Sequence, residues 1–384
     1  MTKDKNGQEA YYVASQWQLM WWKFRKHKLA MIAGPVLIAL YLSALFADFL
    51  SPTLPDTRFT DYKDAPPTAI RFYEEGRGLT APFVYDMVRK TDPQTFKRTF
   101  VVDTSKKYPV ALFAHGEPYR LLGLWRTDVH LLSAGGGPLF LLGTDKLGRD
   151  LFTRILYGSR ISLSIGLVGV ALTFILGLLL GGISGYLGGV VDTVIQRTID
   201  LIVCIPHIPL WMSLAAALPR NLPVTQMYLG IVIIMSAINW TRLARVVRGQ
   251  VLAVREEAFC EAARLAGASD MHMIVRHLLP SMASYIIVRL TLSVPGTILG
   301  ETALSFLGLG LQPPAVSWGV LLQDAQNLET IAHHPWLLAP TVWSVVAGAC
   351  FWVSDNCPAD HVQPSTVECR ASAGVCDVAD PYRT

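Results

Sequence analysis

Charged side chains are scarce in this sequence. Only 16% of its 384 residues are Asp, Glu, Lys or Arg, whereas 52% are hydrophobic. Soluble domains average about 25% charged residues, so the composition indicates a membrane protein. The net charge of +4 is small, and the sequence has neither a basic stripe nor a basic tail. The chain therefore lacks the charge pattern of a nucleic-acid-binding protein.

Motifs for phosphate binding and hydrolysis are missing as well. A P-loop needs the pattern G-x-x-x-x-G-K-[ST], but no Gly-Lys dipeptide occurs. Neither H-E-x-x-H nor G-x-S-x-G is present. The six cysteines form no C-x-x-C pair. His361 with Cys357, Cys369 and Cys376 fits no common zinc spacing. We therefore predict a non-catalytic chain that binds no metal or cofactor itself.

Long apolar runs are what the sequence has in abundance. A helix of about 20 apolar residues spans a bilayer, and an open strand cannot satisfy its backbone in lipid. The expected fold class is thus an all-α integral membrane protein with six transmembrane helices and a mixed external insert between the first and second. The candidate spans are residues 29–50, 162–187, 199–218, 228–247, 285–309 and 336–353. The first is too long for a cleaved signal peptide and is interpreted as an anchor.

Basic residues predict the orientation of these spans. Lysines and arginines precede the first span and gather between the fourth and fifth, at Arg242, Arg245, Arg248, Arg255, Arg264 and Arg276. Short loops rich in Lys and Arg remain cytoplasmic. Six spans place both segments on one side, so we expect cytoplasmic N- and C-termini.

The expected organisation has five parts. Residues 1–28 form an interfacial cytoplasmic segment and 29–50 the first span. Residues 51–158 form the external insert, in which "RTFVVDT" and "KKYPVALFAHG" have the composition of strands. A five-helix core covers 159–354 and contains a cytoplasmic loop at about 250–283. The cysteine-rich residues 355–384 are expected to be a disordered cytoplasmic tail.

Small residues recur at helical spacing in the second span. Gly177, Gly181, Gly185 and Gly189 fall every four residues, on one face of a helix. Such a stripe lets another helix backbone approach closely. We expect tight packing there, either within the chain or with a partner.

A polar segment, "FCEAARLAGASDMHMIVRHLLP" at residues 259–280, interrupts the apolar sequence. Its alanines favour a first helix, and Gly267 can take the left-handed conformation that ends it. Ser269 and Asp270 suit the start of a second helix. His277 falls in its last turn and Pro280 stops it. The pattern predicts two short helices that meet at a corner outside the lipid.

This segment resembles the EAA loop of bacterial ABC importer permeases. The matching positions are Glu261, Ala262, Ala263, Gly267, Leu279 and Pro280, with His277 where that family often has an aliphatic residue. "LGTDKLGRDLFTRILYGSRISLSIG", "GETALSFLGLGLQPPAVSWG" and "WQLMWWKFRKHKLA" resemble the C-type permease subunit of dipeptide and oligopeptide importers. The resemblance reaches to about Val346. The tail beyond it departs from the family pattern.

The resemblance implies a machine with several parts in a bacterial inner membrane. It implies a second homologous permease subunit, two ABC ATPase subunits that bind ATP and Mg, an external substrate-binding protein and a peptide substrate. In the family the EAA helix sits in a groove of the ATPase. The residues expected to couple to the ATPase are Glu261, Ala262, Ala263, Arg264, Gly267, Asp270, His277, Leu279 and Pro280.

Polar and aromatic residues within the spans are candidates for the translocation pathway. They are His207, Asn239, Trp240 and Glu301, and for each a purely structural role is the alternative. Importers of nickel, glutathione, opines or oligosaccharides share the same signatures, so the cargo stays open. An ion-coupled secondary transporter is the alternative of another class. It is disfavoured because paired intramembrane acids near the midplane are missing.

Overall fold

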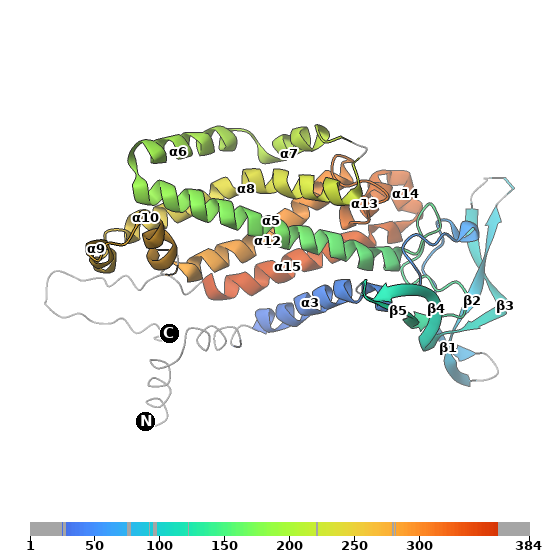
Figure 1. The fold of residues 1–384 in the computed structure, drawn as a ribbon. Coiled ribbons are helices and arrows are strands. Elements are labelled where there is room, and N and C mark those ends of the chain that lie inside the picture. The colour runs from blue at the N-terminus through green and yellow to red at the C-terminus, as the bar shows by residue number, and fades with distance from the viewer. Residues whose placement is uncertain are drawn as a thin grey trace, which may run out of the picture.

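The computed structural model describes residues 25, 28–74, 78–91, 93–94, 98–121, 123–219, 222–278, 280 and 282–359. Long helices run side by side as a bundle, and the strands lie at one end of it (Figure 1). The helices are α3 (Lys28–Leu45), α4 (Ala47–Leu50), α5 (Leu151–Leu187), α6 (Gly189–Cys204), α7 (His207–Ala216), α8 (Val224–Val254), α9 (Ala258–Leu265), α10 (Asp270–His272), α12 (Ala283–Phe306), α13 (Trp318–Leu322), α14 (Leu328–His333) and α15 (Ala339–Ala359).

Four stretches among the described residues are long and apolar enough to cross a membrane. They are α3, α5, α8 and the stretch Pro335–Ser354. The helices α6 and α7 make a fifth if they count as one broken span. Helix α12 is not in this set, and it contains Arg289 and Glu301. The fold class is therefore confirmed as a mostly helical membrane protein, with four or five spans supported directly.

The third predicted span differs from a straight helix. Helices α6 and α7 meet at an angle of 87°. The residue before a proline is disfavoured in the α-helical region, and Ile205, which precedes Pro206, is extended, with φ −93° and ψ 129°. The chain therefore breaks at this point, and α7 begins anew at His207.

The glycine stripe packs α5 directly against α8. A Cβ on Gly177 would lie 2.7 Å from Leu243, and a Cβ on Gly181 would lie 2.6 Å from the carbonyl oxygen of Ala244. Gly185 faces the backbone of Arg248 in the same way. Gly189 does not belong to this contact, because it lies beyond the end of α5 with φ +56°. The close approach predicted from the sequence is thus a contact within this chain.

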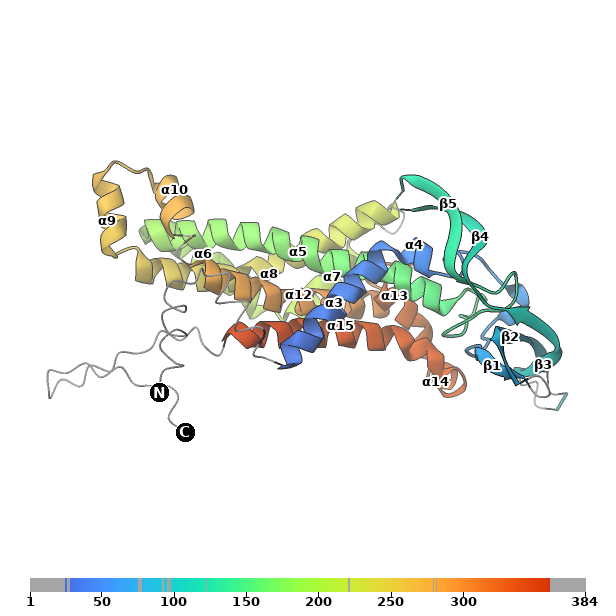
Figure 2. The same ribbon diagram turned by 90° about the horizontal axis from the view of Figure 1, so that it is seen from below.

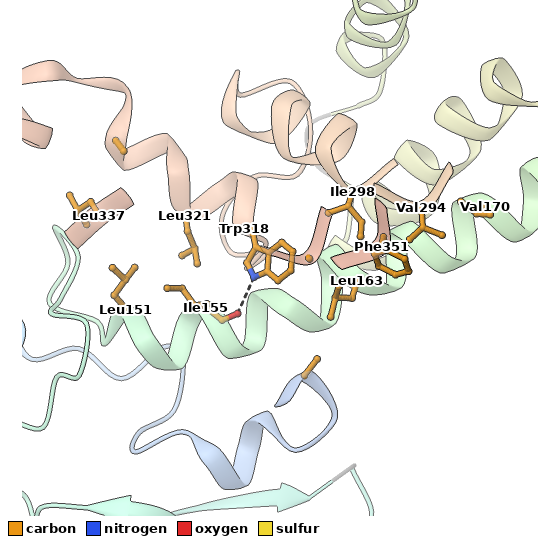
Figure 3. Packing of buried hydrophobic residues seen from close by; sticks show 13 residues of the cluster. Leu151, Ile155, Leu163, Val170, Val294, Ile298, Trp318, Leu321, Leu337 and Phe351 are labelled. Atoms are coloured by element: carbon orange, nitrogen blue, oxygen red, sulfur yellow. Dashed lines mark hydrogen bonds between the residues drawn. The ribbon is translucent and has the colours of Figure 1, made fainter. Parts of the chain in front are cut away.

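The largest fully buried side chain is Trp318, at the start of α13. It packs between α5 and α12 with Ile155, Leu163 and Ile298, and its indole Nε1 donates to the carbonyl oxygen of Ile155 at 3.3 Å (Figure 3). A short helix thereby inserts between long ones and fixes their spacing. One of the buried hydrophobic clusters of the bundle lies at this level.

The strands form two small antiparallel sheets. One has the order β1-β2-β3 and the other pairs β4 with β5. Their bounds are β1 Arg71–Glu74, β2 Gly78–Thr91, β3 Arg98–Pro109, β4 Ala111–Leu121 and β5 Trp125–Ser133. The buried ring of His130 joins β5 to the segment after α4, with Nδ1 2.6 Å from the Ser51 oxygen and Nε2 2.9 Å from the Glu117 oxygen.

Both predicted terminal segments lie largely outside the described residues. This holds for almost all of the interfacial segment at 1–28 and for the predicted tail from residue 360 onward. Helix α15 continues to Ala359. The last helix is therefore longer than the predicted end at 354, and residues 355–359 are helical rather than part of a disordered tail.

Candidate functional site

A sharp corner lies at the end of the bundle opposite the strands, as Figures 1 and 2 both show. Helix α9 ends at Leu265, and Gly267 has φ +83°. The amide of Gly267 donates to the Arg264 oxygen at 2.9 Å, and that of Ala268 to the Ala263 oxygen at 3.1 Å. This is the left-handed helix ending that glycine favours. A second helix follows as α10, continued by the π-type helix Met273–Leu278.

The corner is anchored on the two long helices beneath it. Cys260 of α9 and Met273, Ile274 and Leu278 of the π-type helix are buried in one cluster with Val251 of α8. The Arg264 guanidinium lies over the ring of Tyr186 from α5, 5.3 Å from its centroid. The corner and the adjoining ends of α5 and α8 therefore form one packed unit.

The outer surface of the corner exposes both apolar and charged side chains. Leu265 is 91% exposed, and Met271 and Val275 are about half exposed. Glu261 and Asp270 are exposed beside them. An exposed apolar patch with a polar rim is typical of a protein interaction site. This surface is therefore suited to contact a partner.

The structure places the predicted coupling residues as follows. Ala263 is half-buried, and His277 lies in the π-type helix. Leu279 lies outside the described residues. The exposed members are Glu261, Ala262, Arg264, Gly267, Asp270 and Pro280. Apart from Leu279, all of them lie in α9, in α10, in the π-type helix or directly beside these helices.

Ion pairs brace the helices next to the corner. Arg248 of α8 donates twice to the Asp192 carboxylate of α6, through Nε and Nη2 at 2.6 Å each. Arg245 also pairs with Asp200. Asp192 and Asp200 lie eight positions apart, on one face of α6, and Arg245 and Arg248 lie three apart on α8. The spacing places each set on one side of its helix, but no local pattern shows that α6 lies beside α8.

The four pathway candidates are not gathered in one place. His207 is exposed at the start of α7, with its ring 5.0 Å from that of Trp211. Asn239 is half-buried, and Trp240 is buried against Ile199. Glu301 is completely buried. Trp240 and Glu301 are thus enclosed by the chain's own helices.

Glu301 is the centre of a buried serine network. Its carboxylate accepts from the hydroxyls of Ser305 and Ser317 at 2.8 Å and of Ser162 at 3.2 Å. Each serine oxygen in turn accepts a backbone amide, from Leu311, Val320 and Trp318 respectively. Each serine hydroxyl thus accepts one hydrogen bond from a backbone amide and donates one to the carboxylate. The network joins α12, α5 and the start of α13.

The Glu301→Gln variant is expected to be less stable by about 1–3 kcal/mol, because an amide nitrogen cannot accept and leaves a buried serine hydroxyl unpaired. The measurement is thermal unfolding of the purified chain in detergent. Ser293→Ala, on the same helix, is the matched control because the Ser293 hydroxyl is exposed and, within the described part of the chain, bonds only the Arg289 oxygen. Equal melting temperatures for Glu301→Gln and wild type would contradict the network.

A metal centre finds no support in the described part of the chain. Among those residues, no three His, Cys, Asp or Glu side chains are grouped as a metal ion would require.

Comparison with known proteins identifies related chains. The model of the family "Binding-protein-dependent transport system inner membrane component" matches residues 177–356, and that of "N-terminal TM domain of oligopeptide transport permease C" matches residues 15–67. The first match includes the corner. The second includes α3.

Three curated relatives are similar over the membrane part. The dipeptide transport system permease protein DppC of Bacillus subtilis is 39% identical over 194 residues, 50% of this chain and 58% of that protein. The oligopeptide permease OppC of Haemophilus influenzae is 38% identical over 230 residues, 59% and 71% of the two chains. The glutathione permease GsiD of Pectobacterium atrosepticum is 35% identical over 207 residues, 54% and 67%.

The chain therefore spans little more than half the length of the Bacillus protein and over two thirds of the Haemophilus protein. Both family models name a membrane component, in agreement with the long apolar helices. This chain belongs to the family of binding-protein-dependent transport system inner membrane components, in its branch of dipeptide and oligopeptide permeases.

Proposed function

We propose that this chain is the permease subunit of an ATP-driven ABC importer for peptides and forms half of the translocation pathway. The observation that carries the proposal is the packed helical corner, which has the EAA sequence and lies at one end of the long apolar helices. The chain itself is non-catalytic in this proposal, and ATP and Mg bind to partner ATPase subunits.

The proposed membrane topology has six spans. Helix α12 supplies the fifth, and the broken pair α6–α7 supplies the third. The arginines of α8 and α9 favour a cytoplasmic corner under the positive-inside rule. The five strands, at the opposite end of the bundle (Figure 1), then lie outside the cell as the mixed insert. An even number of spans leaves both termini in the cytoplasm.

The corner is the proposed contact with the ATPase. Its exposed Leu265 and Met271 supply apolar area, and Glu261 and Arg264 supply charges. A ligand shifts a conformational equilibrium only through different affinities for the two states. The corner must therefore bind two arrangements of the ATPase pair unequally. Its packing on α5 and α8 then passes that difference to the transmembrane helices.

The proposed partners follow from the same machine. They are a second homologous permease subunit, two ABC ATPase subunits and an external substrate-binding protein, all within a lipid bilayer. Cargo is the least constrained part. Peptide is favoured because two of the three relatives above are named for dipeptide or oligopeptide transport. The third is named for glutathione, and nickel, opines and oligosaccharides are competing cargoes.

The test is uptake into proteoliposomes. The chain is co-expressed with the ATPase, second permease and binding-protein subunits of the proposed importer, and the complex is reconstituted with ATP. Radiolabelled dipeptides and oligopeptides are expected to accumulate only when ATP, the ATPases and the binding protein are present. Labelled nickel is offered in parallel as a competing cargo. Uptake by vesicles that lack the ATPases would contradict the proposal and favour an ion-coupled transporter.

A further inference from the structure

The turn between β4 and β5 exposes large apolar side chains. Arg120 pairs with Arg126 across the two strands, and Leu121 with Trp125. Gly123 has φ +74° and allows the tight reversal. Leu124 is 73% exposed and Trp125 is 66% exposed. We call Arg120–Leu121 together with 123–126 the hairpin tip. Such exposure is unfavourable in water, since the side chains bury little of their area.

The hairpin tip lies against the outer surface of two membrane spans. Arg120 and Gly123 line one hollow together with Tyr41 and Leu45 of α3 and Leu167 of α5. Leu45 and Leu167 are themselves 47% and 49% exposed. Asp48 and Arg160, which form an ion pair, line the same hollow. The tip therefore lies where the apolar outer surface of α3 and α5 meets charged groups.

The depth of this contact follows from the length of α5. Its 37 residues rise about 55 Å, whereas the hydrocarbon core is about 30 Å thick and takes about 20 helical residues. Arg255 donates to the Gly185 oxygen at 3.3 Å, and charged groups of this kind mark the inner boundary. Counting about 20 residues back from Gly185 reaches the region of Leu167. The tip thus lies at the outer boundary of the membrane.

The side chains of the tip suit that boundary. Trp is enriched at membrane–water interfaces, with its ring at the level of the headgroups. Arg binds phosphate in a bidentate manner, and both arginines of the tip are exposed. A stable protein interface buries about 800 Å² on each side. Two or three apolar side chains on a narrow turn are few for such an interface, but they suffice as a lipid anchor.

We propose that the hairpin tip inserts into the outer leaflet of the membrane. Leu124 and Trp125 enter the boundary between headgroups and acyl chains, and Arg120 and Arg126 bind lipid phosphates. The insert is then held against the bilayer by its own loop, in addition to its attachments to α4 and α5. The outer side of the membrane is assigned here from the topology proposed above, and insertion of the tip does not depend on the cargo.

The test uses spin labels on the full-length chain, purified with its accompanying subunits and placed in lipid nanodiscs. The six native cysteines are replaced by alanine, and one label is attached through Leu124→Cys. Leu79→Cys is the matched control, because Leu79 is 87% exposed on β2 of the other sheet. Collisions with oxygen, which partitions into lipid, are compared with collisions with a water-soluble nickel chelate.

The label at 124 is expected to collide with oxygen at least about threefold more, relative to the nickel chelate, than the label at 79, since the hydrocarbon core excludes the water-soluble chelate. A label at 124 as accessible to the chelate as the label at 79 would overturn the proposal in favour of exposure to water. Low collision rates with both reagents would overturn it in favour of a protein partner.

The role of the arginines has a separate readout. Arg120→Gln with Arg126→Gln is expected to lower the oxygen-to-chelate ratio at 124, because the tip loses its attachment to phosphates and sits less deeply. Arg71→Gln, in the other sheet, is the control and is expected to leave the ratio unchanged. An unchanged ratio in the double variant would remove lipid phosphates from the proposal.

Discussion

The Gly267→Val variant is expected to enter the membrane but to lose more than about tenfold of its ATP-driven uptake. Gly267 has φ +83°. For a residue with a Cβ the left-handed region is less favourable by about 1–2 kcal/mol of conformational free energy, and β-branched residues are affected most. Since 1.4 kcal/mol is a factor of about 10 in an equilibrium, this strain is enough to shift the corner away from its native angle. The measurement is uptake and ATP hydrolysis in the same proteoliposomes.

Crowding does not explain this expected loss. A Cβ at position 267 would meet no heavy atom within 4 Å, so only backbone conformation is altered. Gly267→Asn is the matched control, because asparagine tolerates the left-handed region, and it is expected to retain uptake within about twofold. Full uptake by the valine variant would show that the angle of the corner is irrelevant to coupling. Equal losses in both variants would point to direct contact at this position instead.

The Gly181→Val variant is expected to fail at an earlier stage, in the folding of the bundle. Its Cβ would lie 2.6 Å from the Ala244 oxygen and 2.9 Å from the Ala244 Cα. Both are backbone atoms of α8, which cannot rotate aside as a side chain can. Overpacking usually lowers the free energy of unfolding by about 1–3 kcal/mol. A clash between a β-branched side chain and the backbone is expected to lower it by more than about 3 kcal/mol.

The measurement for Gly181→Val is the amount of monodisperse protein extracted from membranes, followed by thermal unfolding. Gly249→Ala is the control, since a Cβ there would meet nothing within 4 Å and alanine is about 1 kcal/mol better than glycine in a helix. That variant is expected to match or exceed the wild type. A Gly181→Val chain as stable as the wild type would mean that α5 and α8 are not held in contact.

Local patterns made part of this fold predictable. Long apolar runs located α3, α5 and α8, because hydropathy depends only on neighbouring residues. The ending of α9 was predictable for the same reason, since glycine is the residue that adopts φ +83° without strain. The stripe of Gly177, Gly181 and Gly185 predicted close helix packing, although only the structure identified α8 as the partner.

Features that depend on the register between distant segments were not predictable. The serines around Glu301 come from residues 162, 305 and 317, and nothing in their spacing brings them together. The pairing of Asp192 with Arg248 likewise requires α6 to lie beside α8. Pro206 explains why the helix breaks there, but the angle of 87° depends on where α7 finds its packing partners. The position of the β4–β5 turn beside α3 and α5 was not predictable for the same reason.

Helix α5 connects the two ends of the molecule without interruption. Its N-cap is Asp150, at the end of the segment that follows β5. Its last turn contains Tyr186, whose ring lies beneath the Arg264 guanidinium. A rigid rod of about 55 Å that pivots by about 10° near one end displaces its other end by on the order of 10 Å. In the importer proposed above, a small rotation imposed at the corner would thereby be amplified into a movement large enough to open or close a passage for a small peptide.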